Sequence, residues 1–124
     1  MSRRVLVVDD DESIRQFIEM ALRDDGFEVA VAPEGATALQ EAAAFKPDVI
    51  LLDMRMPGVD GWTFAEAYRA GPGPHAPILV LTAARDAEEY AVAIRADAVL
   101  AKPFDLAELI RMLNALADRE PAGG

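Results

Sequence analysis

The chain has 124 residues, contains no cysteine and carries a formal charge of −10 at pH 7. Its length predicts one domain with one hydrophobic core, and the absence of thiols excludes disulfides and thiolate metal sites. The acidic charge argues against direct binding to nucleic acid. No segment resembles a signal peptide or is long and apolar enough to span a membrane, so we expect a cytoplasmic protein.

The first half of the chain predicts three strands separated by helices. Val5 to Val8 is an unbroken apolar run, which is typical of a strand covered on both faces. Residues 27–31 and 49–52 have the same character and predict the second and third strands. Alanines favour a helix over residues 34–45. The first helix is predicted by apolar residues at helical spacing, ended by Gly26: Ile14, Phe17, Ile18, Ala21 and Leu22.

The second half continues this alternation. Helices are predicted over residues 62–70 and 86–94, and strands over 78–81 and 98–101. The last helix begins at Leu106, because apolar residues then repeat at helical spacing and Asp105 with Glu108 resembles a capping box. We expect the domain to cover residues 1–119, with 120–124 forming a disordered tail or the start of a linker.

Five aliphatic strands that alternate with five helices predict an α/β fold of the (βα)5 type. Strands that are apolar throughout favour a parallel sheet with helices on both faces, which makes a three-layer sandwich. The common doubly wound arrangement at this size is flavodoxin-like, with strand order 2-1-3-4-5.

Polar side chains follow four of the five predicted strands, at the carboxyl ends of those strands. Ligands bind at this edge of doubly wound sheets, close to the point where the strand order reverses. The second strand, which the predicted order places at an edge of the sheet, ends in Val31 and Ala32. The polar residues at the other strand ends are Asp9, Asp10, Asp11, Asp53, Thr82 and Lys102.

Several carboxylates at one sheet edge repel one another unless a cation neutralises them. Mg²⁺ suits such a site, because it binds one or two carboxylates together with waters and a phosphate. A carboxylate, a hydroxyl and an ammonium group beside Mg²⁺ are suited to phosphoryl transfer, in which the carboxylate acts as nucleophile.

The chain strongly resembles the response-regulator receiver domains of two-component signalling, the CheY-like superfamily. The matching segments are VLVVDDDES at 5–13, LLDMRMPGVDGW at 51–62, PILVLTAA at 77–84 and AKPF at 101–104. They occur in the family's order, and the resemblance extends from Arg4 to about Ala117.

The resemblance implies that Asp53 accepts a phosphoryl group from a sensor histidine kinase or a phosphotransfer protein. It implies that Asp10 and Asp53 bind Mg²⁺ directly, that Asp9 acts mainly through water, and that the backbone carbonyl of Arg55 is a further ligand. Thr82 would hydrogen-bond the acyl phosphate, and Lys102 would form an ion pair with it. The Lys102–Pro103 peptide bond resembles the cis peptide of the family. The domain would catalyse its own phosphorylation and dephosphorylation without being an enzyme for other substrates.

The resemblance also implies a conformational switch that a downstream output domain or partner protein reads, with a possible homodimer through the helix 4–strand 5–helix 5 face. Two positions depart from the family pattern. Val99 stands where an aromatic residue is usual, and Arg95 stands where glycine is usual. These departures motivate a second hypothesis, a receiver-fold interaction module whose switch is impaired. A flavodoxin-like cofactor carrier fits less well, because the first loop offers carboxylates where phosphate binding needs glycines and hydroxyls.

Other polar and aromatic residues have simpler interpretations. Asp11 is interpreted as a helix N-cap rather than a metal ligand. His75, the single histidine, is interpreted as a solvated loop residue. Trp62 and Phe104 are expected to pack against the scaffold.

Overall fold

The computed structural model describes residues 3–53, 58–83 and 95–118, and the side chains of 58–60 are outside this description. Within these residues, parallel strands form one sheet in the order β2-β1-β3-β4-β5, as predicted. The strands are β1 (Arg4–Val8), β2 (Glu28–Ala32), β3 (Val49–Asp53), β4 (Ile78–Ala83) and β5 (Ala98–Lys102).

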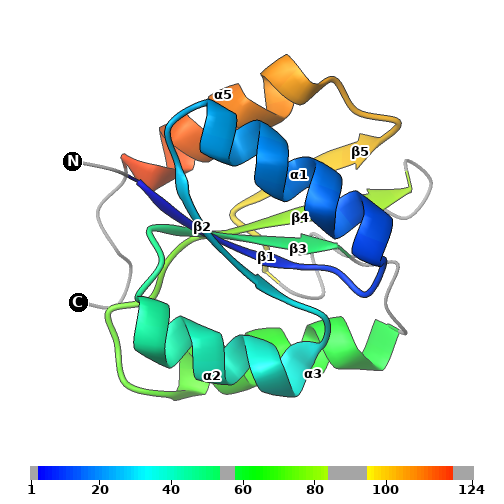
Figure 1. The fold of residues 1–124 in the computed structure, drawn as a ribbon. Coiled ribbons are helices and arrows are strands. Elements are labelled where there is room, and N and C mark those ends of the chain that lie inside the picture. Colours follow the sequence, from blue (N-terminus) through cyan, green and yellow to red (C-terminus); the bar gives the residue numbers. More distant parts are fainter. Residues whose placement is uncertain (1–2, 54–57, 84–94, 119–124) are drawn as a thin grey trace.

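Helices cover both faces of this sheet (Figure 1). One face carries α1 (Glu12–Asp24) and α5 (Leu106–Ala117), and the other carries α2 (Gly35–Phe45) and α3 (Gly58–Ala70). The predicted helix over residues 86–94 lies outside the described residues. None of the helices in the described part of the chain is long and apolar enough to cross a membrane.

The sheet divides the hydrophobic core into two layers. Side chains alternate between the faces of a strand, so Leu6 and Val8 pack on the α2–α3 side while Val5 and Val7 pack on the α1–α5 side. Strands buried on both faces therefore need continuous apolar sequence, which explains why the strand runs of this chain show no polar alternation. The polar residues are left to the strand ends.

The third helix begins four residues before its predicted start. It starts at Gly58, whereas apolar spacing predicted Trp62. The segment from Gly58 to Gly61 contains two glycines and an aspartate, which are turn-forming residues, and so it carries no helical apolar stripe.

Two side-chain interpretations from the sequence were wrong. Trp62 is 47 % exposed, because α3 turns Phe64 and Ala65 toward the sheet instead. His75 is half-buried: its Nε2 lies 2.8 Å from the Gly71 carbonyl oxygen, and its ring meets that of Tyr68 edge to face at 5.2 Å between centroids. Phe104 packs against the α1–α5 layer, as predicted.

Tyr68 anchors the connection between α3 and β4. Its hydroxyl oxygen accepts a hydrogen bond of 2.7 Å from the Ala76 backbone N–H, and its ring stacks on Phe64. Burial raises the pKa of the Tyr68 hydroxyl above its ordinary value. The α3–β4 connection is thus held by ring packing that sequence spacing does not reveal.

Candidate phosphoacceptor site

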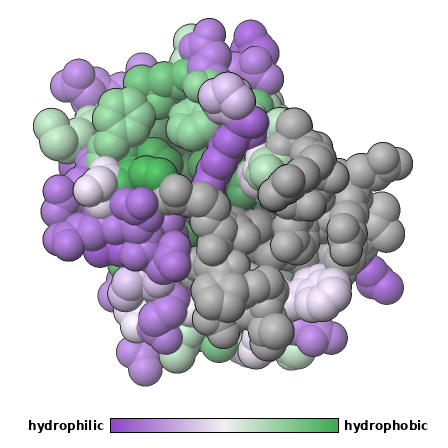
Figure 2. Space-filling view, turned by 90° about the vertical axis from the view of Figure 1, so that its right-hand side faces the viewer, coloured by the Kyte–Doolittle hydropathy of each residue, from purple (hydrophilic) through white to green (hydrophobic). Residues whose placement is uncertain are grey.

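The carboxyl ends of β1, β3, β4 and β5 bring the predicted polar residues to one edge of the sheet. Val8 is paired with Leu52 in the parallel register, so Asp9 and Asp53 follow on adjacent strands. Thr82 is paired with Ala101, which places it one residue from the position opposite Lys102. Figure 2 views the molecule from the side toward which these strands run, where a hydrophobic patch is bordered by hydrophilic residues.

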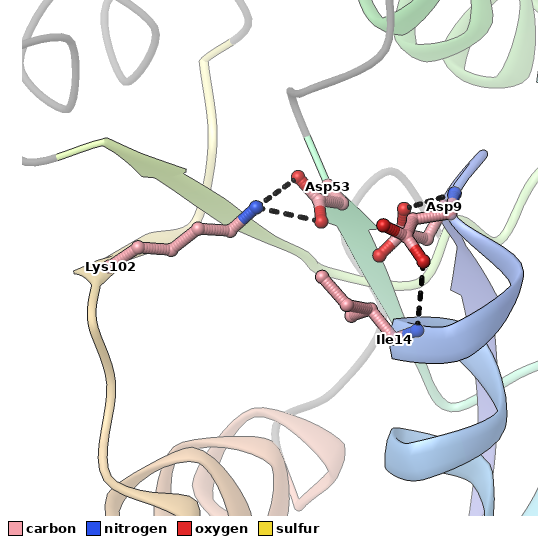
Figure 3. A network of polar contacts seen from close by, with 5 residues as sticks. Asp9, Ile14, Asp53 and Lys102 are labelled. Atoms are coloured by element: carbon pink, nitrogen blue, oxygen red, sulfur yellow. Dashed lines mark hydrogen bonds and ion pairs between the residues drawn. The ribbon is translucent and has the colours of Figure 1, made fainter.

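Asp53 and Lys102 form a two-pronged ion pair. The Lys102 Nζ lies 2.7 Å from Oδ1 and 2.8 Å from Oδ2 of Asp53 (Figure 3). The Asp53 side chain is 2 % exposed and the Lys102 side chain 21 % exposed, so the ammonium group reaches the carboxylate from the more accessible side. Burial removes the hydration of the carboxylate, and the ammonium group offsets this loss with a close opposite charge.

Thr82 is also buried, with 3 % of its surface exposed. Its position near the end of β4 places it in the same row of strand ends as Asp53 and Lys102. The Lys102–Pro103 peptide bond is cis, as the resemblance implied.

Asp9 is fully buried at the end of β1 and is tied to its surroundings. Its backbone N–H donates to the Ala32 carbonyl oxygen at 3.1 Å, and its Oδ1 accepts a hydrogen bond from the Asp11 N–H at 2.9 Å. Asp11 is the N-cap of α1, since its Oδ1 accepts from the Ile14 N–H at 3.1 Å. The prediction of an N-cap role for Asp11 is confirmed.

Asp10 differs from its neighbours because it is exposed. Among the described residues, no group of three carboxylate or histidine side chains is gathered closely enough to hold a metal ion. The predicted ligand Arg55 lies outside the described residues. The buried carboxylates of Asp9 and Asp53, on adjacent strands, still offer the hard oxygen donors that Mg²⁺ prefers, and Mg²⁺ needs only one or two carboxylates. The residues therefore fit Mg²⁺ as part of a ligand set, although they do not form a complete cage.

One residue near the site was missed by the sequence interpretation. Arg15, in the second turn of α1, donates from Nη1 to the Asp9 carbonyl oxygen at 2.8 Å. The sequence did place a cation one helical turn after three consecutive aspartates, which could have indicated this contact. The helix was predicted from the spacing of its apolar residues alone, and Arg15 is not one of them.

The two departures from the family pattern have different structural consequences. Val99 is partly buried against the α2–α3 layer, where its side chain serves packing. Arg95 has φ 57°, a left-handed conformation that favours glycine, and its carbonyl oxygen accepts a hydrogen bond of 2.7 Å from Arg69 Nη2. The chain has therefore kept a glycine-type conformation at a position that has no glycine.

Known proteins similar to this chain include transcriptional regulators. It is 43 % identical over 120 residues to the transcriptional regulatory protein PrrA of Mycobacterium tuberculosis, a match that covers 95 % of this chain and 51 % of PrrA. It is 37 % identical over 127 residues to the DNA-binding response regulator MtrA of the same organism, covering 98 % of this chain and 55 % of MtrA. The chain thus spans about half the length of these relatives.

Similar solved structures are single receiver domains. The signal receiver domain of a response regulator from Bermanella marisrubri matches with a TM-score of 0.84 and 33 % identity, covering 95 % of this chain and 100 % of that one. The receiver domain of a sensor histidine kinase from Pseudomonas aeruginosa, solved with a magnesium ion coordinated in its active-site cleft, matches with a TM-score of 0.84 and 32 % identity, covering 96 % and 100 %.

The family model described as the response regulator receiver domain matches residues 5–114, which include β2 to β5, all of β1 except Arg4, and most of α5. Sequence, fold and strand-end residues agree with this match, and the chain belongs to the response-regulator receiver domain family of two-component systems.

Proposed function

We propose that this receiver domain accepts a phosphoryl group on Asp53 from a sensor histidine kinase or a phosphotransfer protein. The observation that carries the proposal is the buried Asp53 carboxylate at the end of β3, bound through both oxygens by Lys102. A carboxylate is a suitable nucleophile for phosphoryl transfer, and an ammonium group beside it can neutralise the oxygens of the incoming phosphoryl group.

The proposed reaction is a displacement at phosphorus. An Asp53 oxygen forms the new P–O bond while the P–N bond of a phosphohistidine breaks, and the imidazole leaves with the electron pair of that bond. Lys102 shifts from the free carboxylate to the phosphoryl oxygens and neutralises their charge, while the Thr82 hydroxyl donates a hydrogen bond to them. Attack by water on the acyl phosphate reverses the modification.

Mg²⁺, when bound, would supply positive charge against the transferring phosphoryl oxygens. Asp10 and Asp53 would hold it directly, Asp9 would hold it through water, and the Arg55 backbone carbonyl would complete the protein ligands. The magnesium ion in the active-site cleft of the Pseudomonas receiver domain supports a magnesium site by analogy.

The phosphorylated domain would signal to a downstream output domain or partner protein. The added negative charge would shift the conformation of the surface around β5. A homodimer through a face made by the helix predicted over residues 86–94, β5 and α5 is one form this output would take. PrrA and MtrA are regulators of about twice this length, which supports an output domain as the recipient in relatives of this kind.

A second candidate is a receiver-fold interaction module with an impaired switch. It is favoured by Val99, which packs against the core where the family usually has an aromatic residue, and by the arginine at position 95. Under this alternative, the domain would bind its partner equally well with and without phosphate.

The intact mass of the protein after incubation with Mg²⁺ and acetyl phosphate tests the proposal. We expect one phosphoryl adduct on the wild type, and none on Asp53→Ala or after chelation of the metal. Persistence of the adduct on Asp53→Ala would overturn the acceptor assignment. An adduct that leaves amide chemical shifts of β5 unchanged would favour the impaired module over the switch.

A further inference from the structure

We propose that Arg15 is a positioning residue for the metal-binding end of this site. Its guanidinium fixes the peptide bond between Asp9 and Asp10, and through that bond the direction in which the Asp10 carboxylate points. This inference rests on the function proposed above, since it concerns how this chain would hold Mg²⁺.

The contact joins α1 to the peptide unit between the two acidic residues. Arg15 is half-buried, and its Nη1 donates to the Asp9 carbonyl oxygen at 2.8 Å. A peptide unit is planar, so a bond that fixes its oxygen also fixes the following N–H and Cα. The guanidinium thereby restricts ψ of Asp9 and φ of Asp10.

The residues on either side of Asp10 are held by other bonds. Asp9 is buried and bonded to Ala32 and Asp11, while Asp11 caps the helix through the Ile14 N–H. Asp10 itself is exposed, so packing does not orient its side chain. The orientation of an exposed ligand depends on its backbone, and the Arg15 contact acts on that backbone directly.

The charge of Arg15 and its hydrogen bond would have opposite effects on Mg²⁺ affinity. A cation beside an acidic site repels a divalent cation, so removal of its charge alone would tighten Mg²⁺ binding. Loss of a positioning contact would weaken binding, because groups that orient metal ligands typically change metal affinity by about 10–100-fold when they are removed. The sign of the change therefore separates a positioning role from a purely electrostatic one.

The experiment is a calorimetric titration of the full chain with MgCl₂, comparing the wild type with Arg15→Met. Methionine keeps an unbranched apolar stem but lacks the guanidinium. We expect the Mg²⁺ dissociation constant of Arg15→Met to rise by about tenfold. The rate of adduct formation with acetyl phosphate should return to the wild-type value at saturating Mg²⁺, and Arg15→Lys should recover part of the lost affinity.

Arg23→Met is the matched control. Arg23 lies on the same helix, and its Nη2 donates to the Val29 carbonyl oxygen at 2.9 Å and lies 2.9 Å from Glu19 Oε2. This variant loses the same charge and a similar guanidinium-to-carbonyl hydrogen bond, but at the opposite end of α1 from Asp9 and Asp10. We expect its Mg²⁺ affinity to match that of the wild type.

Unchanged or tighter Mg²⁺ binding by Arg15→Met would overturn the positioning role. If thermal unfolding shows that Arg15→Met does not fold, Arg15→Gln, which keeps a polar helix former, decides by the same criterion. Failure of the proposed function looks different: the wild type itself would then bind no Mg²⁺ and form no adduct. If the wild type binds Mg²⁺ and forms the adduct, and Arg15→Met binds Mg²⁺ with the wild-type affinity, only the role of Arg15 is refuted.

Discussion

One ion pair joins the ends of β3 and β5, and the proposed chemistry depends on it. Lys102 contacts both oxygens of the buried Asp53 carboxylate, so it acts as the counter-charge of that group when no other cation is bound. Removal of one partner of a buried pair leaves the other charge uncompensated, and this is more damaging than the loss of a surface ion pair.

Lys102→Met should therefore make the stability of the fold depend strongly on Mg²⁺. In chelator, we expect the free energy of unfolding to fall by about 2–3 kcal/mol, somewhat below the usual range for a fully buried pair because Lys102 is partly exposed. Saturating Mg²⁺ should restore most of this loss, because ligand binding stabilises the folded state. Urea denaturation with and without Mg²⁺ measures both terms. Equal losses in the two conditions would contradict the counter-charge role.

Arg95 shows a conflict between the residue and its backbone conformation. A non-glycine residue in the left-handed region costs on the order of 1 kcal/mol. Replacement by glycine would recover only part of this cost, because glycine has more conformational freedom in the unfolded chain. We expect Arg95→Gly to raise the free energy of unfolding by about 0.5 kcal/mol, and Arg95→Ala to give no gain. Chemical denaturation checks both variants, and a loss of stability in Arg95→Gly would mean that the arginine side chain has stabilising contacts of its own.

Three of the described helices start at acidic N-caps, and the cap of α5 is Asp105, whose side chain accepts from the Ala107 N–H. Asp11 caps α1, and Glu34 caps α2 by accepting hydrogen bonds from the Thr37 N–H at 2.7 Å and the Ala36 N–H at 3.3 Å. Hydrogen bonding from Thr37 lowers the pKa of the Glu34 carboxyl below its ordinary value. The folded helix thus stabilises the ionised form of the Glu34 carboxyl.

Glu34→Gln should weaken α2 in a pH-dependent way. Because the folded-state pKa is lowered, the contribution of Glu34 is fully present above its unfolded-state pKa and is lost as pH falls through the folded-state value. The urea midpoints of the wild type and Glu34→Gln should therefore differ at pH 7 and converge as the pH falls through the folded-state pKa of Glu34. Glu66→Gln, at an exposed position on α3, serves as the control. A difference that persists at low pH would exclude ionisation as its origin.

Most of the elements were predictable because buried strands require runs of apolar residues, which are visible in the sequence. The runs at Val5–Val8 and Val49–Leu52 are apolar because both faces of the sheet are covered, and the residues that follow them are polar because they leave the core. The start of α3 was not predictable, since it begins at Gly58 without an apolar stripe. The setting of His75 was missed as well, because ring contact with Tyr68 depends on tertiary packing.

The candidate site was predictable in its composition but only partly in its geometry. The sheet-edge rule brought Asp9, Asp53 and Lys102 together correctly, since the order of the strands decides which ends are neighbours. The exposure of Asp10 and the contact of Arg15 with the Asp9 carbonyl depend on the path of the β1–α1 loop. Residue spacing does not specify that path.

Over the whole molecule, the acidic charge and the receiver fold fit the proposed role of accepting a phosphoryl signal better than a role in DNA binding. The net charge of −10 opposes contact with nucleic acid, and its relatives PrrA and MtrA, one of them named as DNA-binding, are about twice as long. The fold brings the candidate site residues to one edge of the sheet, where phosphorylation of a single carboxylate would change the local charge.

The assignment of Asp53 as the phosphoacceptor can be tested by identifying the residue that carries the phosphoryl group. Hydroxylamine converts an acyl phosphate into a hydroxamate at the same carboxyl group, and tandem mass spectrometry of the digested protein identifies the residue. After incubation with acetyl phosphate and Mg²⁺, we expect one hydroxamate, at Asp53. A hydroxamate at Asp9 or Asp10, or none at any residue, would contradict the assignment of Asp53 as the phosphoacceptor.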